Sequence, residues 1–424
     1  MYQRSVLPNK LRIVTHDMKE RDSVSIGLFV DAGGRYEADQ LKGAAHFLEH
    51  ILFKGSRKYS CDEIKEKIEG VGGSLNAFTT EEMTCYLAKV PSRHVPRTFD
   101  ILADMVVDPL IPKREVEKEK GVIIEEIKMY HDLPQYFVLD LLDGMLWPGH
   151  PLGKNLAGSE ETVSGMSHTD LRGFHRAHYS ARNLVVAACG AVRHQSFVQL
   201  VKGKLSGMSE GNRTDFIAVQ DSQAKPKTVF SRKGIEQMHL ALGMHGLHKD
   251  HEDKYIMALL HIILGGNMSS RLFDEVREKR GLAYSISTSL KAFHDTGMFM
   301  VRAGVDNRKI VDAVAVILKE LAKIKKNGVT AGEFSRAKDY YLGQVQLCLE
   351  DTMDHMLWIG ESTVAFDRMR KVEEIIRIVK KIKIGDIRRL ARDIIRQERF
   401  NLAVVGPITG TQEKELNSLI GVKS

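Results

Sequence analysis

The feature that most constrains the fold of this chain is an internal duplication. Four landmarks of the first half recur in the second half in the same order, between 211 and 218 residues later. They are two apolar strands and two helices that run into glycine. The pairs are 24–30 and 239–245, 53–55 and 262–266, 62–70 and 272–281, and 183–190 and 401–406. Self-similarity at one spacing indicates two copies of the same structural unit.

The duplication predicts two homologous domains, at about residues 1–205 and 228–424, joined by the polar stretch 206–227 as a linker. A length of 424 residues suits this division, since roughly 150 residues per domain is a common size. Strands mixed with long amphipathic helices favour the α/β (α+β) class. We therefore expect each domain to hold a mixed, mostly antiparallel sheet with helices packed on one face.

The cysteines and the apolar stretches of the sequence indicate the cellular compartment in which the protein is expected. No two of its four cysteines stand in a C-x-x-C pair, which excludes a zinc ribbon or a disulfide scaffold and suits a reducing compartment. The most apolar stretches, 184–192 and 255–264, are far shorter than the ~18 residues of a membrane span. Residues 1–14 lack the pattern of a signal peptide and read as a turn that leads into a strand. We expect a cytoplasmic protein without a membrane partner.

The net charge of +7 is concentrated in one segment. Residues 368–399 contain twelve Lys and Arg against five Asp and Glu, whereas the rest of the chain is nearly balanced. Apolar residues recur at helical spacing in this segment, which predicts a helix with a solvated basic face. The alternative is a docking surface for an anionic partner. Nucleic acid is not expected, because no aromatic residues are interleaved with the charges.

The most informative motif is His46-Phe-Leu-Glu-His50, within the apolar run 44–53. On a helix His46 and His50 are about 40° apart, and Glu49 lies about 60° to the other side of His46, so all three share one face. Two imidazoles four residues apart can bind one Zn²⁺, with the carboxylate within reach of a water on the metal. The order H-x-x-E-H is the inverse of H-E-x-x-H. The alternative is a pair of structural histidines in a packed helix.

A catalytic zinc with two histidines usually takes a third protein ligand. The predicted helix over 115–131 offers one. Glu119 and Glu126 are seven residues apart and nearly superpose on such a helix, so one can bind the metal while the other supports a ligand. Periodicity alone does not distinguish Glu126 from its neighbour Glu125.

Together these motifs resemble the inverzincin zinc peptidases, the family of pitrilysin, insulin-degrading enzyme and the mitochondrial processing peptidase. The resemblance implies that Zn²⁺ is held by His46, His50 and Glu126, that Glu49 is the general base, and that Glu119 is the supporting carboxylate. In its length and its single pair of domains, the chain is similar to the short-chain, processing-peptidase-like branch of the family. The segments that carry the resemblance are 46–55, 72–78, 119–126 and 146–153.

The second half lacks the metal motif, because His261 has no Glu or His at the needed offsets in the mirrored helix. We therefore expect one zinc per chain. Arg277 and Tyr284 keep the Arg-x6-Tyr spacing with which family members hold the substrate backbone and the developing oxyanion. The first half also contains a segment similar to the edge strand with which the family pairs an extended substrate. That segment is Leu75, Asn76, Ala77 and Phe78.

The resemblance also bears on the substrate. Arginine-selective processing peptidases carry a Glu ten residues and an Asp fourteen residues beyond the third zinc ligand. Here these positions are Tyr136 and Asp140. Asp140 is therefore a candidate substrate-binding residue, but strong arginine selectivity is not expected.

The sequence thus predicts a zinc-dependent endopeptidase that hydrolyses short or unstructured peptides, held as an added strand in an enclosed chamber. In double-length family members four domains enclose such a chamber. The resemblance therefore implies a two-fold homodimer, or pairing with a related chain, in which Arg277 and Tyr284 of one subunit complete the zinc site of the other. The alternative is a catalytically silent scaffold or partner subunit, similar to respiratory-complex core subunits in which the zinc motif is degraded.

Overall fold

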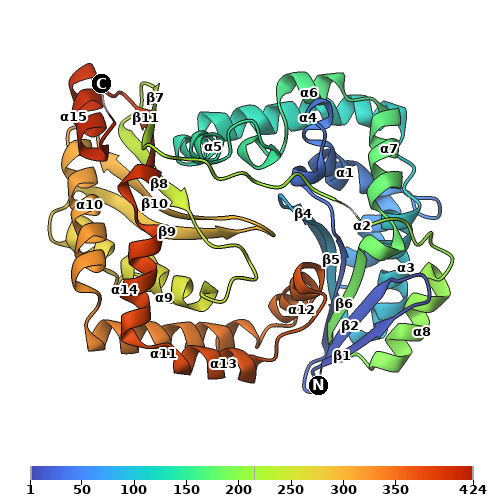
Figure 1. Cartoon of the computed structure of the whole chain (residues 1–424). Coiled ribbons are helices and arrows are strands. Elements are labelled where there is room, and N and C mark those ends of the chain that lie inside the picture. Colours follow the sequence, from blue (N-terminus) through green and yellow to red (C-terminus); the bar gives the residue numbers. More distant parts are fainter. Residues whose placement is uncertain (1, 214, 423–424) are drawn as a thin grey trace. The chain divides into compact units, whose positions relative to one another are not determined.

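The computed structural model describes residues 2–213 and 215–422 (Figure 1). The chain divides into two compact units, each built on one sheet. Unit 1 comprises Met1–Lys128, Lys154–Ile217 and Gln346–Arg370. Unit 2 comprises Met129–Gly153, Ala218–Val345 and Lys371–Ser424.

The sheet of unit 1 has six strands in the order β1-β2-β6-β3-β5-β4. The pair β2 and β6 is parallel, and all other neighbours are antiparallel. The strands are β1 (Tyr2–Val6), β2 (Arg12–Asp17), β3 (Ser23–Val30), β4 (Ser74–Thr79), β5 (Thr84–Pro91) and β6 (Leu184–Gly190).

The sheet of unit 2 has five strands in the order β7-β11-β8-β10-β9, again with one parallel pair, β7 and β11. This arrangement repeats that of unit 1 strand for strand, without an equivalent of β1. The predicted duplication of a mixed, mostly antiparallel sheet is therefore confirmed. The strands are β7 (Lys227–Arg232), β8 (Gln237–His245), β9 (Ala283–Ala292), β10 (Gly297–Asp306) and β11 (Asn401–Gly406).

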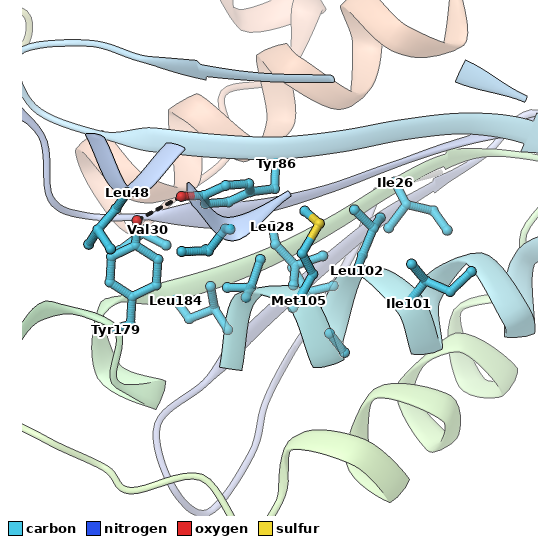
Figure 2. Close-up of a cluster of buried hydrophobic side chains, with 14 of the residues drawn as sticks. Ile26, Leu28, Val30, Leu48, Tyr86, Ile101, Leu102, Met105, Tyr179 and Leu184 are labelled. Carbon is cyan, nitrogen blue, oxygen red and sulfur yellow. Dashed lines mark hydrogen bonds between the residues drawn. The ribbon is translucent and has the colours of Figure 1, made fainter. Parts of the chain in front are cut away.

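The main core of unit 1 lies between one face of its sheet and the helices of the first half. Figure 2 shows two side chains of β3 in this core, Val30 near Leu48 of α1 and Leu28 near Leu102 of α3. Beneath α1 the hydroxyls of Tyr86 and Tyr179 share a hydrogen bond of 2.9 Å. The helices are α1 (Ala44–Leu52), α2 (Cys61–Glu69), α3 (Val95–Val107), α4 (Lys113–Asp132), α6 (Glu160–Gly165), α7 (His168–His178) and α8 (His194–Leu205).

The helices of the second half begin with α9 and include the basic segment noted in the sequence. In that segment Ile387, Leu390 and Ile394 of α14 are buried and the basic residues are exposed, as the helical spacing predicts. A π-helical turn, η6 (Phe273–Glu278), replaces most of the helix expected over 272–280. The helices are α9 (Lys254–Gly265), α10 (Ile310–Asn327), α11 (Ala331–Cys348), α13 (Val372–Lys381), α14 (Ile384–Ile394) and α15 (Gly410–Ile420).

Each sheet has a second face that is covered by a helix from the other half of the chain. Helix α12 (Thr352–Phe366) packs on β3 and β6 of unit 1, and α5 (Pro134–Leu146) packs on β8 and β11 of unit 2 (Figure 1). Gly27 of β3 and Gly243 of β8 allow this close approach. A Cβ on Gly27 would lie 2.5 Å from Met356 Sδ of α12, and one on Gly243 would lie 2.8 Å from Leu142 of α5.

This exchange of helices, by which α12 and α5 each cover the sheet of the other half of the chain, explains why the central strands are buried on both faces. All seven residues of β6 are buried, whereas a sheet covered on one face would alternate. The predicted domains were the continuous ranges 1–205 and 228–424, and the two units differ from them in the segments that contain α5 and α12. The sequence could not predict this, because an apolar stripe shows that a helix packs but not on which sheet it packs. No helix among the described residues is both long enough and apolar enough to cross a membrane.

Candidate metal centre

Helix α1 presents the predicted motif because its other face is anchored in the core. Its apolar residues, among them Phe47, Leu48 and Ile51, are fully buried, while the histidines and Glu49 are half-buried on the opposite face. The start of the helix is held by the buried carboxylate of Glu37. It accepts the backbone N–H of Gly43 and of Ala45, at 3.0 and 2.7 Å.

Helix α4 turns a second set of carboxylates toward α1. Val116, Glu119 and Ile123 are buried along one stripe, and Glu126 continues this stripe. Glu125 instead has a side chain that is 74% exposed and pairs with Lys128 at 3.0 Å. The burial of α4 therefore distinguishes the two carboxylates that periodicity alone left open.

The structure brings His46, His50 and Glu126 together. One ligand atom of each lies within 4.8 Å of the others, and no other such group occurs in residues 2–213 and 215–422. Glu126 Oε2 is 3.8 Å from His46 Nε2 and 3.5 Å from His50 Nε2. Tetrahedral zinc ligands about 2.1 Å from the metal lie about 3.4 Å apart. Two imidazoles and one carboxylate at these separations therefore fit Zn²⁺.

Glu119 supports the second histidine. It is 5% exposed and accepts the His50 Nδ1 hydrogen at 3.0 Å through Oε1, while Lys54 Nζ lies 2.7 Å from Oε2. Burial alone would raise the pKa of Glu119, but the hydrogen bonds from Lys54 and His50 hold it below its ordinary value. With Nδ1 protonated, His50 keeps Nε2 as the metal-binding nitrogen.

Glu49 receives a hydrogen bond that the sequence did not reveal. Thr79 Oγ1 donates to Glu49 Oε2 at 2.6 Å. Burial raises the pKa of Glu49, and the Thr79 hydroxyl opposes this shift by stabilising the charged carboxylate. Thr79 belongs to a strand and Glu49 to a helix thirty residues earlier, so no local pattern joins the two residues. The only sequence signal that could have predicted the contact is the register of the hairpin that contains Thr79.

The predicted substrate strand is β4, which stands at the edge of the sheet. It contains Leu75, Asn76, Ala77 and Phe78, and its last residue is Thr79. The Asn76 side chain accepts the Ala77 N–H at 2.9 Å. An edge strand leaves backbone groups available for a further strand.

The remaining candidates lie in unit 2. The Arg277 guanidinium carbon is 5.9 Å from the ring centroid of Tyr284, whose side chain is 75% exposed, so the spacing of the two does bring them together. Asp140 lies on α5. His261 of α9 has Nδ1 2.7 Å from Thr288 Oγ1, which is a structural hydrogen bond in place of a metal ligand.

Two models of one peptidase family match this chain. Residues 12–160 match the family model described as insulinase (peptidase family M16), and residues 165–341 match the model described as peptidase M16 inactive domain. A Streptomyces coelicolor protein named as an uncharacterized zinc protease is 36% identical over 99% of this chain and 92% of its own. The Bacillus subtilis protein YmxG, named likewise, is 33% identical over 96% of this chain and 98% of its own.

Solved structures show the same fold. A protease from Helicobacter pylori superposes with a TM-score of 0.90 at 21% identity, covering 96% of this chain and 99% of that one. A peptidase M16 inactive domain from Pseudomonas fluorescens gives 0.89 at 19% identity, covering 96% and 98%. Since relatives more than 30% identical span almost its entire length, the resemblance drawn from the motifs is confirmed and this chain belongs to the peptidase M16 family.

Proposed function

We propose that this chain is a zinc-dependent endopeptidase acting on short or unstructured peptides. The observation that carries the proposal is the convergence of His46 Nε2, His50 Nε2 and Glu126 Oε2 beside the carboxylate of Glu49. Relatives named as zinc proteases support the choice of metal.

In this proposal His46, His50 and Glu126 hold the metal, and Glu119 orients His50. Bound Zn²⁺ supplies Lewis acidity, which polarises the scissile carbonyl and lowers the pKa of water toward ~7. Glu49 takes the proton from the attacking water and then delivers it to the leaving amine.

The substrate would be held by β4. A peptide that adds to the edge of a sheet gains main-chain hydrogen bonds, which give affinity with little demand on its sequence. Only an extended segment can pair in this way, so a folded protein is a poor substrate. We include Asp140 as a side-chain contact, with Arg277 and Tyr284 as the groups that hold the substrate backbone and the oxyanion.

We further propose that the chain works as a two-fold dimer enclosing a chamber, in the cytoplasm. Arg277 and Tyr284 of each subunit then complete the zinc site of the other. Mixing Glu49→Gln chains with Tyr284→Phe chains under subunit exchange should restore about a quarter of wild-type activity, because half of the dimers are mixed and one of their two sites is free of both changes. No recovery, with exchange confirmed, would mean that the site is completed within one chain.

The central test is Glu49→Gln. This variant should retain about one zinc per chain and the wild-type unfolding curve but lose peptide hydrolysis, since an amide cannot accept the proton. Zinc is measured by elemental analysis, and cleavage by mass spectrometry of an unstructured peptide mixture. Loss of zinc from the variant would make Glu49 a ligand. A wild-type protein that binds zinc but cleaves nothing would instead favour the scaffold alternative.

A further inference from the structure

We propose that Thr79 is the positioning residue of the general base, an inference that rests on the peptidase function proposed above. Its hydroxyl donates to Glu49 Oε2 at 2.6 Å. Among the described residues, Thr79 is the one that donates to this carboxylate, through its hydroxyl and also through its backbone N–H. The hydroxyl bond fixes the Oε2 atom of Glu49.

Glu49 needs such a restraint. Its side chain has three rotatable bonds, and it extends from the half-buried face of α1. The charges of its neighbours act on it in opposite senses, since His50 attracts the carboxylate and Glu126 repels it. Without Thr79, the carboxylate would be free to leave the orientation that proton transfer requires.

The position of Thr79 is itself fixed by a tight hairpin. Thr79 lies opposite Thr84 in the β4–β5 register, and Thr84 Oγ1 donates to Ala32 O at 3.0 Å. In the turn that follows, Thr80 N donates to Met83 O at 2.8 Å and Met83 N donates to Thr80 Oγ1 at 3.0 Å. These bonds leave the hairpin little freedom.

The hairpin is joined to α1 through the segment 33–45. Gly33 packs so closely that a Cβ there would lie 2.1 Å from Thr80 O, and Arg35 N donates to Glu81 O at 2.7 Å. Arg35 also forms a buried ion pair with Glu82 at 2.7 Å. The same segment contains Glu37, whose carboxylate caps α1.

One short stretch of chain therefore sets the separation between Thr79 and Glu49. Because Thr79 also ends the edge strand β4, the base is held in a fixed relation to the strand proposed to bind the substrate. Alignment of the base and alignment of the peptide are then properties of one rigid element.

The test compares Thr79→Val with Thr79→Ser. Valine keeps the branched shape that suits a strand and the backbone N–H but removes the hydroxyl donor, so kcat should fall roughly 10- to 100-fold while KM and zinc content stay at wild-type values. Serine restores the donor and should recover most of the loss. Thr228→Val is the matched control, because Thr228 also lies on an edge strand, β7, and donates one hydrogen bond, to Asn417 at 2.7 Å. It should leave kcat unchanged.

A second readout does not depend on turnover. In crystal structures of the two metal-free variants, the Glu49 carboxylate should leave its wild-type position in Thr79→Val and keep it in Thr79→Ser. An unchanged carboxylate in the valine variant, an unchanged kcat, or no rescue by serine would overturn the inference. If the wild-type protein itself cleaves no peptide, the proposed function fails, and the crystal structures still decide whether Thr79 positions Glu49.

Discussion

Replacing Glu119 with glutamine should weaken zinc binding without unfolding the protein. The two oxygens of Glu119 have different partners, His50 Nδ1 at 3.0 Å and Lys54 Nζ at 2.7 Å. An amide has only one oxygen. If the amide oxygen accepts the hydrogen bond from His50, the NH₂ group faces the Lys54 ammonium. If the amide oxygen instead accepts from Lys54, the NH₂ group faces His50 and the imidazole is no longer held in position.

The burial of these groups sets the magnitude. Glu119 is only 5% exposed, so loss of its negative charge next to His50 is poorly compensated by water. The Lys54 side chain is 29% exposed and can turn toward solvent, which limits the penalty on that side. Loss of a carboxylate that supports a metal-binding histidine typically weakens metal affinity 10- to 100-fold, or about 1.4 to 2.7 kcal/mol.

The assay is a competition titration with a chromogenic chelator, together with a urea unfolding curve for each protein. Glu125→Gln is the matched control. It makes the same chemical change on the same helix, at a carboxylate that is 74% exposed and paired with Lys128. Wild-type zinc affinity in a folded Glu119→Gln protein, or an equal loss in Glu125→Gln, would refute the argument from burial and hydrogen bonding.

Two further predictions concern stability. Gly360→Ala should destabilise the protein by about 1 to 3 kcal/mol because the new Cβ would lie 2.2 Å from the Phe29 ring, whereas Gly343→Ala in α11, with nothing within 4 Å, should stabilise it by about 0.5 to 1 kcal/mol. Equal midpoints for the two variants in urea would contradict this. Burial and the stacked His355 ring, 4.3 Å away, lower the pKa of His16 to about 4, so the unfolded chain binds a proton there more readily than the folded protein. The resulting stability is fully present above pH 6.5 and is lost as the pH falls toward 4, and His16→Phe should reduce this loss in unfolding curves taken across that range.

The sequence predicted the residues of the candidate metal site more completely than it predicted how the helices pack on the sheets. The angular spacing on one helix was enough to place His46, Glu49 and His50 on a common face, because that geometry is local. Thr79 was not predicted, since its contact with Glu49 depends on the pairing of β4 with β5 and on the segment that joins this hairpin to α1.

The exchanged helices show the same limit on a larger scale. Helices α5 and α12 have the apolar stripes expected of packed helices, but a stripe contains no information about its partner. The glycines against which they pack, Gly27 and Gly243, likewise contain no sequence signal of which helix approaches them.

The exchange also affects how the chain folds during synthesis. The sheet of unit 1 is complete in sequence once β6 has been made, yet the helix that covers its second face, α12, ends only at Phe366. At translation rates of ~5 to 20 residues per second, roughly 10 to 35 seconds separate the two events. During that interval an apolar sheet face that includes Phe29 and Val185 has no cover from its own half. The nascent chain therefore reaches a stage at which its first sheet is complete but one apolar face of that sheet awaits α12, and exposed faces of this kind favour aggregation.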